Sequence, residues 1–270
     1  MRNYTLNELA NALTEKGYKT NVTSNQKNGI DIPCISIRFD TYGCFIYPQA
    51  DIDNVNNGTV DFDTVVNRYV EVIEDAKLNK PIEVNKLFEK EYLKANVFLA
   101  IERDFDANYI KEPLADFPGL SKYMMCRMSI ADGNGCVRIT DALVNACGAD
   151  PNEVWEWAME NTIKDTTCNK ISDLIGMPWF DDMPMYVLST KSQYKGASAI
   201  LNKSALDNVA KLMNTKDIII IPSSINEVIV IPKNATEEME LVANMIKEVN
   251  ATEVAPEEVL FDEPFTYTVE

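Results

Sequence analysis

The sequence predicts an α+β protein whose mixed or antiparallel sheets carry helices packed on their faces. Two β-branched runs, Ile218–Ile221 and Val228–Ile231, are typical of strands covered on both faces, and Pro222–Asn226 joins them with hairpin-like spacing. Amphipathic stretches over Lys203–Met213 and Glu237–Val249 have the period of helices, with their apolar side chains on one face. We expect the helix over Glu237–Val249 to cover the sheet that the hairpin forms.

The first third of the chain predicts a small α+β unit. Leu6–Lys16 has a helical apolar stripe, Thr5 can cap its first turn and Gly17 can end it. Lys27–Gly29 is a turn signal between two alternating stretches, which is typical of a hairpin. The elements expected next are strands over Ile30–Ile37 and Cys44–Tyr47, and a helix that begins at Asp61 or Asp63 and continues to Asp75.

The middle of the chain predicts a strand over Val97–Ile101, followed by a hairpin. Tyr123–Ile130 reaches the turn Asp132–Gly135 and returns through Cys136–Ile139. The two glycines of this turn are what a tight hairpin requires, because they adopt left-handed backbone angles without strain.

Two helices are expected after this hairpin, and the second carries a tryptophan with two possible roles. The first covers Thr140–Cys147, and Asp150 can cap the second, with Pro151 at its first position. Trp157 points roughly away from the apolar face of the second helix, so it either packs under a loop or is an exposed contact residue. That apolar face comprises Val154, Trp155, Ala158, Met159 and Thr162.

The last third predicts further strands and a possible domain boundary. The strands are expected over Met185–Leu188 and Ala197–Leu201, with short edge strands over Val259–Phe261 and Phe265–Val269. The loop Asp173–Pro184, rich in glycine and proline, is the best seam in the chain. It separates an N-terminal α+β region, residues 1–176, from a C-terminal α+β region, residues 177–270, that holds the hairpin and an acidic tail. One continuous domain is the alternative.

The composition is that of an ordinary globular protein, with 46% apolar and 25% charged residues in a chain of 270. No apolar run approaches the roughly 18–20 residues that span a bilayer. The first residues lead directly into an amphipathic pattern instead of the apolar segment of a signal peptide. The six cysteines lie far apart without a C-x-x-C pair, as expected of reduced, buried thiols. We therefore expect a cytoplasmic protein without a membrane partner.

The sequence contains no histidine, and this excludes several classes of active site. Ser-His-Asp and Cys-His catalysis, a histidine general base and histidine-ligated zinc or iron are all ruled out. The two common Gly-rich phosphate-binding patterns are absent as well. An enzyme would have to rely on carboxylates, lysine, tyrosine or cysteine, so we expect no cofactor and favour a protein that is not an enzyme.

The net charge of −17 is concentrated near the C-terminal end. Residues 234–270 contain ten acidic residues against Lys247 alone, a net charge of −9. Such a surface repels phosphate backbones, which argues against direct nucleic-acid binding. It favours a basic protein partner, or it simply keeps the protein in solution.

Three polar motifs invite a chemical interpretation, and each has a structural alternative. Ser223-Ser224 lies in the expected hairpin turn without a G-x-S-x-G pattern, and turns commonly contain these residues. Asp51–Gly58 resembles a calcium loop, but the third ligand position of an EF-hand falls on Val55, so a solvated loop is favoured. Asp132–Cys136 fails in the same way, because its third ligand position falls on Cys136.

An acidic and aromatic segment lies within the expected boundary loop. Asp181-Asp182 could hold a divalent cation, but one carboxylate pair is more typical of an acidic loop. Trp179-Phe180 directly precede them and either anchor a partner or pack on the body of the protein.

Some segments of the chain have a familiar sequence. The most specific are Met185–Thr190, Gly196–Leu201, Ile221–Ile229, Val249–Val254 and Glu257–Leu260, and weaker ones are Lys27–Gly29, Ile46–Pro48 and Ala158–Thr162. With these residues the chain resembles, over nearly its full length, a bacterial family of unknown function that is common in anaerobic Gram-positive bacteria and often found on mobile elements. Members usually carry histidine where this chain has Asn226, so acid–base chemistry at that turn is not expected. The resemblance implies a compact α+β protein with an accessory role and supplies no activity.

We therefore expect a non-catalytic cytoplasmic protein that binds another protein or acts as an accessory factor. One variant is an acidic inhibitor that presents carboxylates in place of phosphates to a nucleic-acid-binding groove. The alternative from another class is a carboxylate-based, metal-dependent hydrolase, for which Asp132, Asp181 and Asp182 are the candidates. The expected interaction surface comprises Trp157, Trp179, Phe180, Asp181, Asp182, Glu257 and Glu258.

Overall fold

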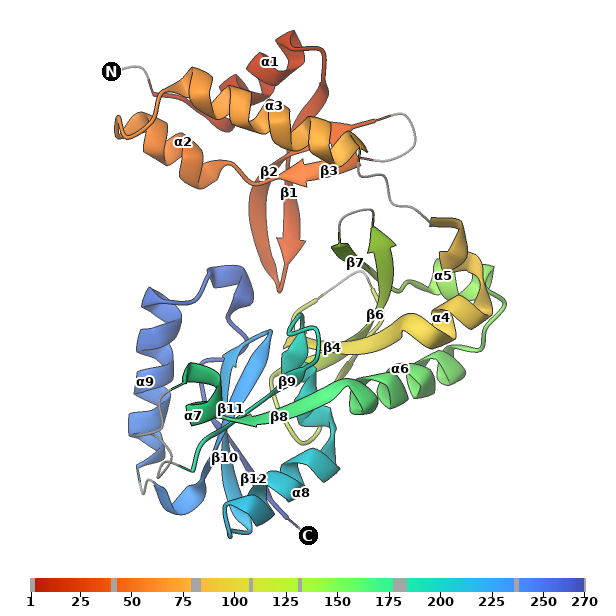
Figure 1. Ribbon diagram of the computed structural model, residues 1–270, viewed down its shortest axis with the longest axis vertical. Helices are drawn as coiled ribbons and strands as arrows, with labels where there is room; N and C mark the ends of the chain where they lie inside the picture. The colour runs from red at the N-terminus through yellow and green to blue at the C-terminus, as the bar shows by residue number, and fades with distance from the viewer. Residues whose placement is uncertain are drawn as a thin grey trace. The chain divides into compact units, whose positions relative to one another are not determined.

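The computed structural model describes residues 3–39, 43–78, 84–106, 109–130, 133–176, 184–235 and 238–269 (Figure 1). Its contacts divide the chain into two units. The first comprises Met1–Ile82 with Ser129–Gly133, and the second comprises Glu83–Met128 with Asn134–Glu270. The sheets of the described residues are antiparallel and are accompanied by helices, which confirms the predicted α+β class.

The chain does not divide between residues 176 and 177, where the sequence suggested a boundary. This position lies inside the second unit, between β8 (Thr166–Lys170) and β9 (Tyr186–Thr190). The two strands pair antiparallel, with Cys168 opposite Leu188. Because one ladder joins the residues before and after the expected seam, they belong to the same unit.

The described residues of the first unit form a long hairpin with a third, short strand and three helices. Thr5 and Glu8 form a capping box at the start of the first helix, where the backbone N–H of Thr5 donates to Glu8 Oε2 at 2.9 Å. The hairpin turns at Asn28 and Gly29, whose φ angles of 50° and 77° are left-handed, as the turn signal predicts. The elements are α1 (Leu6–Glu15), β1 (Lys19–Lys27), β2 (Ile30–Arg38), β3 (Gly43–Ile46), α2 (Gln49–Asn56) and α3 (Phe62–Leu78).

The segment expected to be a solvated loop, Asp51–Gly58, instead lies largely in α2. Tertiary contacts hold this short helix: Ile52 is buried, and the Asp51 carboxylate is 2.5 Å from Arg68 on α3. Asp51 also accepts a hydrogen bond from the Tyr69 hydroxyl at 2.5 Å. Both partners of Asp51 are distant in sequence, so the local pattern could not reveal the helix.

The rest of the chain begins with a short 3₁₀ helix, η1 (Val84–Phe88), and α4 (Lys90–Asn96). A sheet follows in the order β4-β6-β5, and β7 also pairs with β6. The two strands therefore pair as expected, but β7 begins at Gly133, so residues 133–135 lie in the strand and not in the predicted turn. The strands and the helices after them are β4 (Val97–Arg103), β5 (Lys111–Pro113), β6 (Leu120–Ile130), β7 (Gly133–Arg138), α5 (Asp141–Ala146), α6 (Pro151–Asp165) and α7 (Ile171–Ile175).

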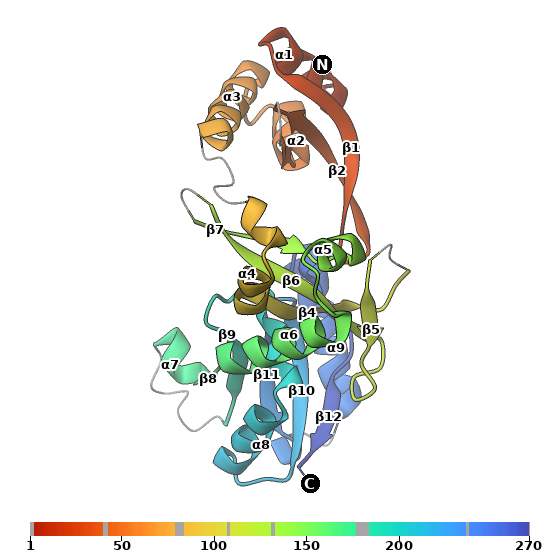
Figure 2. The same ribbon diagram turned by 90° about the vertical axis from the view of Figure 1, so that its right-hand side faces the viewer.

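A five-stranded antiparallel sheet in the order β12-β10-β11-β9-β8 forms the other part of the second unit. Its central hairpin is the predicted one, with Ile220 opposite Val230. Helices α8 and α9 lie on opposite sides of this sheet (Figure 1; Figure 2). Alternate side chains of β10 point to opposite faces: Ile218 belongs to the core with α8, and Ile219 to the core with α9. The elements are β10 (Asp217–Ser224), β11 (Glu227–Pro232), β12 (Phe265–Thr268), η3 (Gly196–Leu201), α8 (Lys203–Leu212), η4 (Lys233–Ala235), α9 (Met239–Thr252) and η5 (Pro256–Glu258).

Two expected strands are wrong. Ala197–Leu201 lies in the 3₁₀ helix η3, because small, buried residues let this segment pack closely under the β9 and β11 strands. Gly196 at its start has no room for a Cβ, which would overlap Ser189 Oγ and the Asn226 carbonyl. Val259–Phe261 forms no strand, whereas the other tail segment is the edge strand β12.

None of the described helices is both long enough and apolar enough to cross a bilayer.

Candidate interaction surface

Helix α9 packs on the sheet with one face only. Val242 and Ile246 are buried and contact Ile219 and Ile221 of β10. Their spacing of four residues places them on one side of the helix, as the amphipathic pattern predicts. This contact holds α9 against the sheet and fixes which side of the helix faces outward.

A second row of apolar side chains on α9 remains exposed. Leu241, Met245 and Val249 follow the spacing i, i+4, i+8, so they lie one above the other along the helix. Their exposed fractions are 62%, 51% and 43%. We call these three residues the α9 row. Isolated exposed apolar residues are ordinary, but an aligned row on one helix is typical of a contact surface.

Acidic residues surround the α9 row. Glu238 and Glu240 lie at the start of the helix, and Glu248 lies in its last turns. Lys247, the basic residue of α9, is 3.8 Å from Glu263 and thus shares its charge with another carboxylate. The field around the row is therefore strongly negative.

The acidic surface continues into the turn after α9. Glu257 and Glu258, both expected at an interaction surface, lie in η5, where Glu257 is half-buried and Glu258 is exposed. The backbone carbonyl of Glu258 accepts a hydrogen bond from Ile225 N at 2.8 Å, which ties this turn to the β10–β11 hairpin. These carboxylates are held on a fixed part of the unit.

The C-terminal end of α9 is also anchored. The Asn250 side chain donates to the Phe261 carbonyl at 3.0 Å and to Asp262 Oδ1 at 2.9 Å. Asp262 in turn pairs with Arg103 of β4 at 3.2 Å. Because the C-terminal end of α9 and the η5 turn are both attached to the sheets, this part of the surface needs little ordering when a partner binds.

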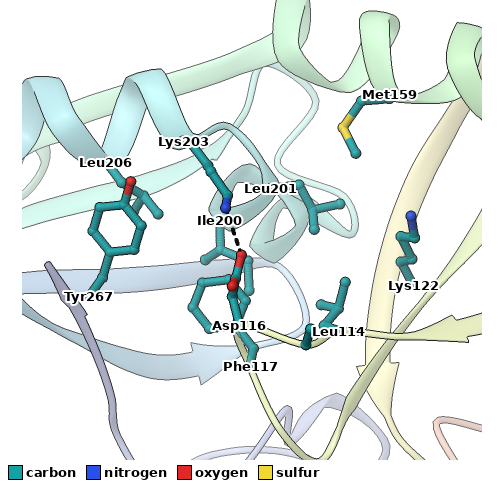
Figure 3. Close-up of a pocket in the computed structure, with 11 residues that line it drawn as sticks. Leu114, Asp116, Phe117, Lys122, Met159, Ile200, Leu201, Lys203, Leu206 and Tyr267 are labelled. Atoms are coloured by element: carbon teal, nitrogen blue, oxygen red, sulfur yellow. Dashed lines mark ion pairs between the residues drawn. The ribbon is translucent and has the colours of Figure 1, made fainter. Parts of the chain in front are cut away.

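The opposite side of the five-stranded sheet carries a small pocket of about 170 Å³ (Figure 3). An engineered cavity of roughly 150 Å³ holds one benzene molecule, so this pocket can take one apolar group. Lys203 and Asp116 form an ion pair of 2.9 Å at its rim, and Lys122 pairs with Glu112 at 3.0 Å. The apolar walls come from Leu114, Phe117, Met159, Ile200, Leu201 and Leu206. The pocket can therefore bind a group through apolar contacts, while its two lysines are paired with carboxylates.

Of the two roles left open for Trp157, that of an exposed contact residue is wrong: the residue packs, although in a core and not under a loop. Its ring is only 9% exposed and belongs to the core between α6 and the β4–β6 sheet. The ammonium groups of Lys90 and Lys94 lie 5.4 and 5.5 Å from the ring centroid and cover its outer side. The remaining predicted contact residues, Trp179-Phe180 and Asp181-Asp182, fall outside the described residues.

The serine turn has a structural role. Ser224 Oγ accepts a hydrogen bond from Asn226 N at 3.0 Å, and Asn226 Oδ1 accepts one from Lys195 N at 3.0 Å. Ser189 Oγ donates to the Asn226 carbonyl at 2.8 Å. Two segments that carry the family resemblance, Met185–Thr190 and Ile221–Ile229, therefore meet at Asn226. The hydrogen bonds of Asn226 hold the backbone of this turn in place.

No cluster of three or more metal-ligating side chains occurs within the described ranges. Asp132, Asp181 and Asp182, the candidates for a hydrolase, lie outside those ranges. Sequence reasoning also missed the α9 row: it assigned the inner face of the helix and left Leu241 and Met245 without a role. Their four-residue spacing was the available signal.

Comparison of the chain with curated proteins and with solved structures gives no match in either case. A family model described as "Family of unknown function (DUF5688)" matches residues 3–268. This match covers almost all of the sequence, both units included. The chain therefore belongs to the DUF5688 family of unknown function.

Proposed function

We propose that this protein is a non-catalytic binding protein whose α9 surface receives a basic, amphipathic segment of a partner protein. The α9 row carries the proposal: Leu241, Met245 and Val249 stay exposed on the side of the helix next to the one that buries Val242 and Ile246. Helices that present apolar side chains at this spacing commonly dock against a complementary groove or helix.

The charge around the row sets the chemistry of the partner. Glu240 and Glu248 flank it on α9, and Glu258 follows on η5. A segment that offers apolar side chains between lysines or arginines would complement both features. Opposite charges of this kind speed association and select against acidic partners.

The apolar row distinguishes this proposal from an acidic inhibitor that imitates nucleic acid. Carboxylates that replace phosphates would give binding that weakens steeply with salt, because exposed charges are screened beyond about 10 Å at 0.1 M ionic strength. Apolar contact at Leu241 and Met245 is largely insensitive to salt. We therefore favour a partner whose complex survives high salt.

The row is an anchor, and it does not supply the whole affinity. Complete burial of a leucine, methionine or valine contributes about 1.5–3 kcal/mol, and these side chains are already partly covered. The three together contribute on the order of 3–4 kcal/mol, less than association usually costs in lost freedom of motion. Contacts between the partner and the glutamates beside the row, Glu240, Glu248 and Glu258, must provide the rest of the binding free energy.

We also place this protein in the cytoplasm. All six cysteines are free, which supports a reducing compartment. We further propose an accessory role on a mobile element, which rests on the sequence resemblance alone.

The proposal is tested by comparing three purified, tagged chains as baits in a nuclease-treated lysate of the native host. The baits are the wild type, a variant with Leu241, Met245 and Val249 changed to alanine, and a matched control, Leu212→Ala on α8. Alanine keeps the helix propensity of these exposed positions, so all three should fold equally.

We expect one stoichiometric partner on the wild type and on the α8 control at both 0.05 and 0.5 M salt, and its loss from the α9 variant. Equal retention by all three baits would reject the α9 surface, and loss from every bait at 0.5 M salt would favour a purely electrostatic complex.

A further inference from the structure

A buried carboxyl group lies on one face of the β4–β6 sheet. Residues of β4 alternate between the two faces: Leu99 and Ile101 point to the side covered by helices, and Ala100 and Glu102 point to the other. Glu102 has no exposed surface, although glutamate is almost never fully buried without partners. An ionisable group in this position requires an explanation.

Only one of the two Glu102 oxygens has a partner among the described residues. The Tyr109 hydroxyl donates a hydrogen bond to Oε1. Oε2 is buried and has none. Buried polar atoms in folded proteins are nearly always hydrogen-bonded, to protein, water or ligand. Oε2 therefore points to a group that the described residues do not supply.

Arg138 of β7 brings a second unsatisfied atom to the same place. Its guanidinium group stacks on the Tyr109 ring at 3.7 Å and lies 5.3 Å from the Tyr123 ring. Its Nε is buried and has no hydrogen-bond partner within the part of the chain that the structure describes. Since Tyr109 contacts both Glu102 and Arg138, the free donor and the free carboxyl oxygen belong to one cluster.

Two lysines add positive charge. Lys111 of β5 lies opposite Tyr123 in the sheet register, and its ammonium group is 3.4 Å from Asp104. Lys195, just before η3, is close enough to act electrostatically on Glu102. The charges of Lys111 and Asp104 offset each other, and Arg138 and Lys195 act as positive charges on Glu102 in a protein whose net charge is −17.

The segment that carries Lys195 is held in a defined conformation. Gln193 and Lys195 have φ angles of 58° and 55°, left-handed values that side chains other than glycine rarely adopt. Asn226 Oδ1 accepts the backbone N–H of Lys195, and Gly196 fits tightly against Ser189. Strained backbone of this kind gathers at functional sites. Between these residues Tyr194 is 47% exposed, so the cluster borders on solvent.

We propose that the cluster of Glu102, Lys111, Arg138 and Lys195, the Glu102 centre, binds a small oxyanion, either a carboxylate or a phosphate. Arg138 Nε–H donates to the anion, the two lysines supply attraction, and protonated Glu102 Oε2 donates a further hydrogen bond. This assignment satisfies both unpartnered atoms and complements the positive charge. It is independent of the α9 surface and extends the function beyond protein binding.

The surroundings of Glu102 raise its pKa above the ordinary value of a glutamate. Burial is the main influence on its pKa and raises it. The Tyr109 hydrogen bond and the charges of Arg138, Lys111 and Lys195 act in the opposite direction. An anion bound beside the carboxyl group would offset those charges and raise the pKa of Glu102 further. Binding should therefore take up a proton and strengthen as the pH falls.

Calorimetric titration of the full chain with inorganic phosphate and with acetate tests the proposal. The comparison includes Glu102→Gln, Arg138→Gln, Lys195→Gln and a matched control, Lys122→Gln, which removes a cation from the opposite face of the same sheet. Thermal unfolding of each variant establishes that it is folded before its binding is measured. The anion that binds more tightly identifies the ligand class.

We expect wild type and Lys122→Gln to bind one anion with equal affinity. Arg138→Gln should weaken binding at least tenfold, and Lys195→Gln about threefold. In buffers of different ionisation enthalpy, acetate binding to wild type should take up a proton. Glu102→Gln, whose amide keeps a donor at this position, should retain the affinity and lose the proton uptake.

Two results would overturn the proposal. One is that neither anion produces heat with the folded wild type at millimolar concentration. The other is that Arg138→Gln and Lys195→Gln, both folded, bind as the wild type does.

Discussion

Helices α8 and α9 pack on opposite faces of the same five-stranded sheet, yet they use their apolar residues differently. α8 places Leu206 and Val209 in the core and exposes one large apolar residue, Leu212, in its last turn. α9 also buries one apolar side, but it exposes the aligned α9 row as well. A single exposed leucine is ordinary, whereas a row is more apolar surface than packing on the sheet requires. The comparison supports the proposal that α9 has a second contact to make.

The largest expected effect is on the free energy of unfolding. It tests whether the buried sides of α8 and α9 contribute equally to stability. Ile246→Ala on α9 and Leu206→Ala on α8 each remove buried methyl groups from the core. Each should lower the free energy of unfolding by about 2–4 kcal/mol, measured by urea denaturation. If Ile246→Ala cost less than about 1 kcal/mol, α9 would not be packed on the sheet as described.

The next largest effect is expected in the α9 row, where a substitution should change partner affinity without changing stability. Met245→Ala removes an exposed side chain, so the free energy of unfolding should change by no more than about 0.5 kcal/mol. Partner affinity should fall about tenfold, equivalent to about 1.4 kcal/mol, because the methionine is an anchor of the interface. A loss of stability with unchanged affinity would assign Met245 to the fold and remove it from the binding surface.

A smaller effect, on the rate of association, is expected from the acidic residues beside the α9 row. Changing Glu240 and Glu248 to glutamine removes two negative charges beside the row without shortening the side chains. We expect association with the partner to slow about two- to fivefold at low salt, with little change in dissociation, because these charges act mainly during approach. Surface plasmon resonance at 0.05 and 0.5 M salt measures both rates. The difference from the wild type should vanish at high salt; a difference that persists would contradict a steering role.

The smallest effect is the control on α8. Leu212→Ala should leave both the free energy of unfolding and partner binding unchanged within error, since Leu212 is 65% exposed and isolated. A loss of binding equal to that of Met245→Ala would show that exposed leucines and methionines act nonspecifically. The exposed residues of α9 would then be no more specific for the partner than Leu212 of α8.

Local patterns predicted much of the fold. The capped helix after Thr5, the turn at Lys27–Gly29, the central hairpin of β10 and β11, and α9 all have their signals in neighbouring residues. Capping, turn geometry and apolar periodicity act over a few positions, so one sequence reveals them.

The wrong predictions depend on distant contacts. α2 is held by Arg68 and Tyr69 of another helix, and η3 is shaped by the tight fit of Gly196 against Ser189 and Asn226. A short apolar run such as Ala197–Leu201 fits a buried strand or a buried helix equally well, and only tertiary packing decides between them.

The candidate sites were only partly accessible to sequence reasoning. The acidic character of the C-terminal region was evident from composition, but the exposure of the α9 row follows from which side of the helix the sheet covers. Glu102 appears in the sequence as the charged end of an apolar strand. Its burial, and the approach of Arg138 from β7, become visible only when the strands are paired.

The measurement that tests the central claim most directly is site-specific photocrosslinking in the native host. A photoreactive amino acid is placed at position 245 on α9 or at position 212 on α8, and crosslinked products are identified by mass spectrometry. We predict one dominant protein adduct from position 245 with an apolar, lysine- or arginine-rich segment at the crosslink, and none from position 212. Identical products from both positions, or no adduct at 245, would contradict the claim that α9 is a docking surface.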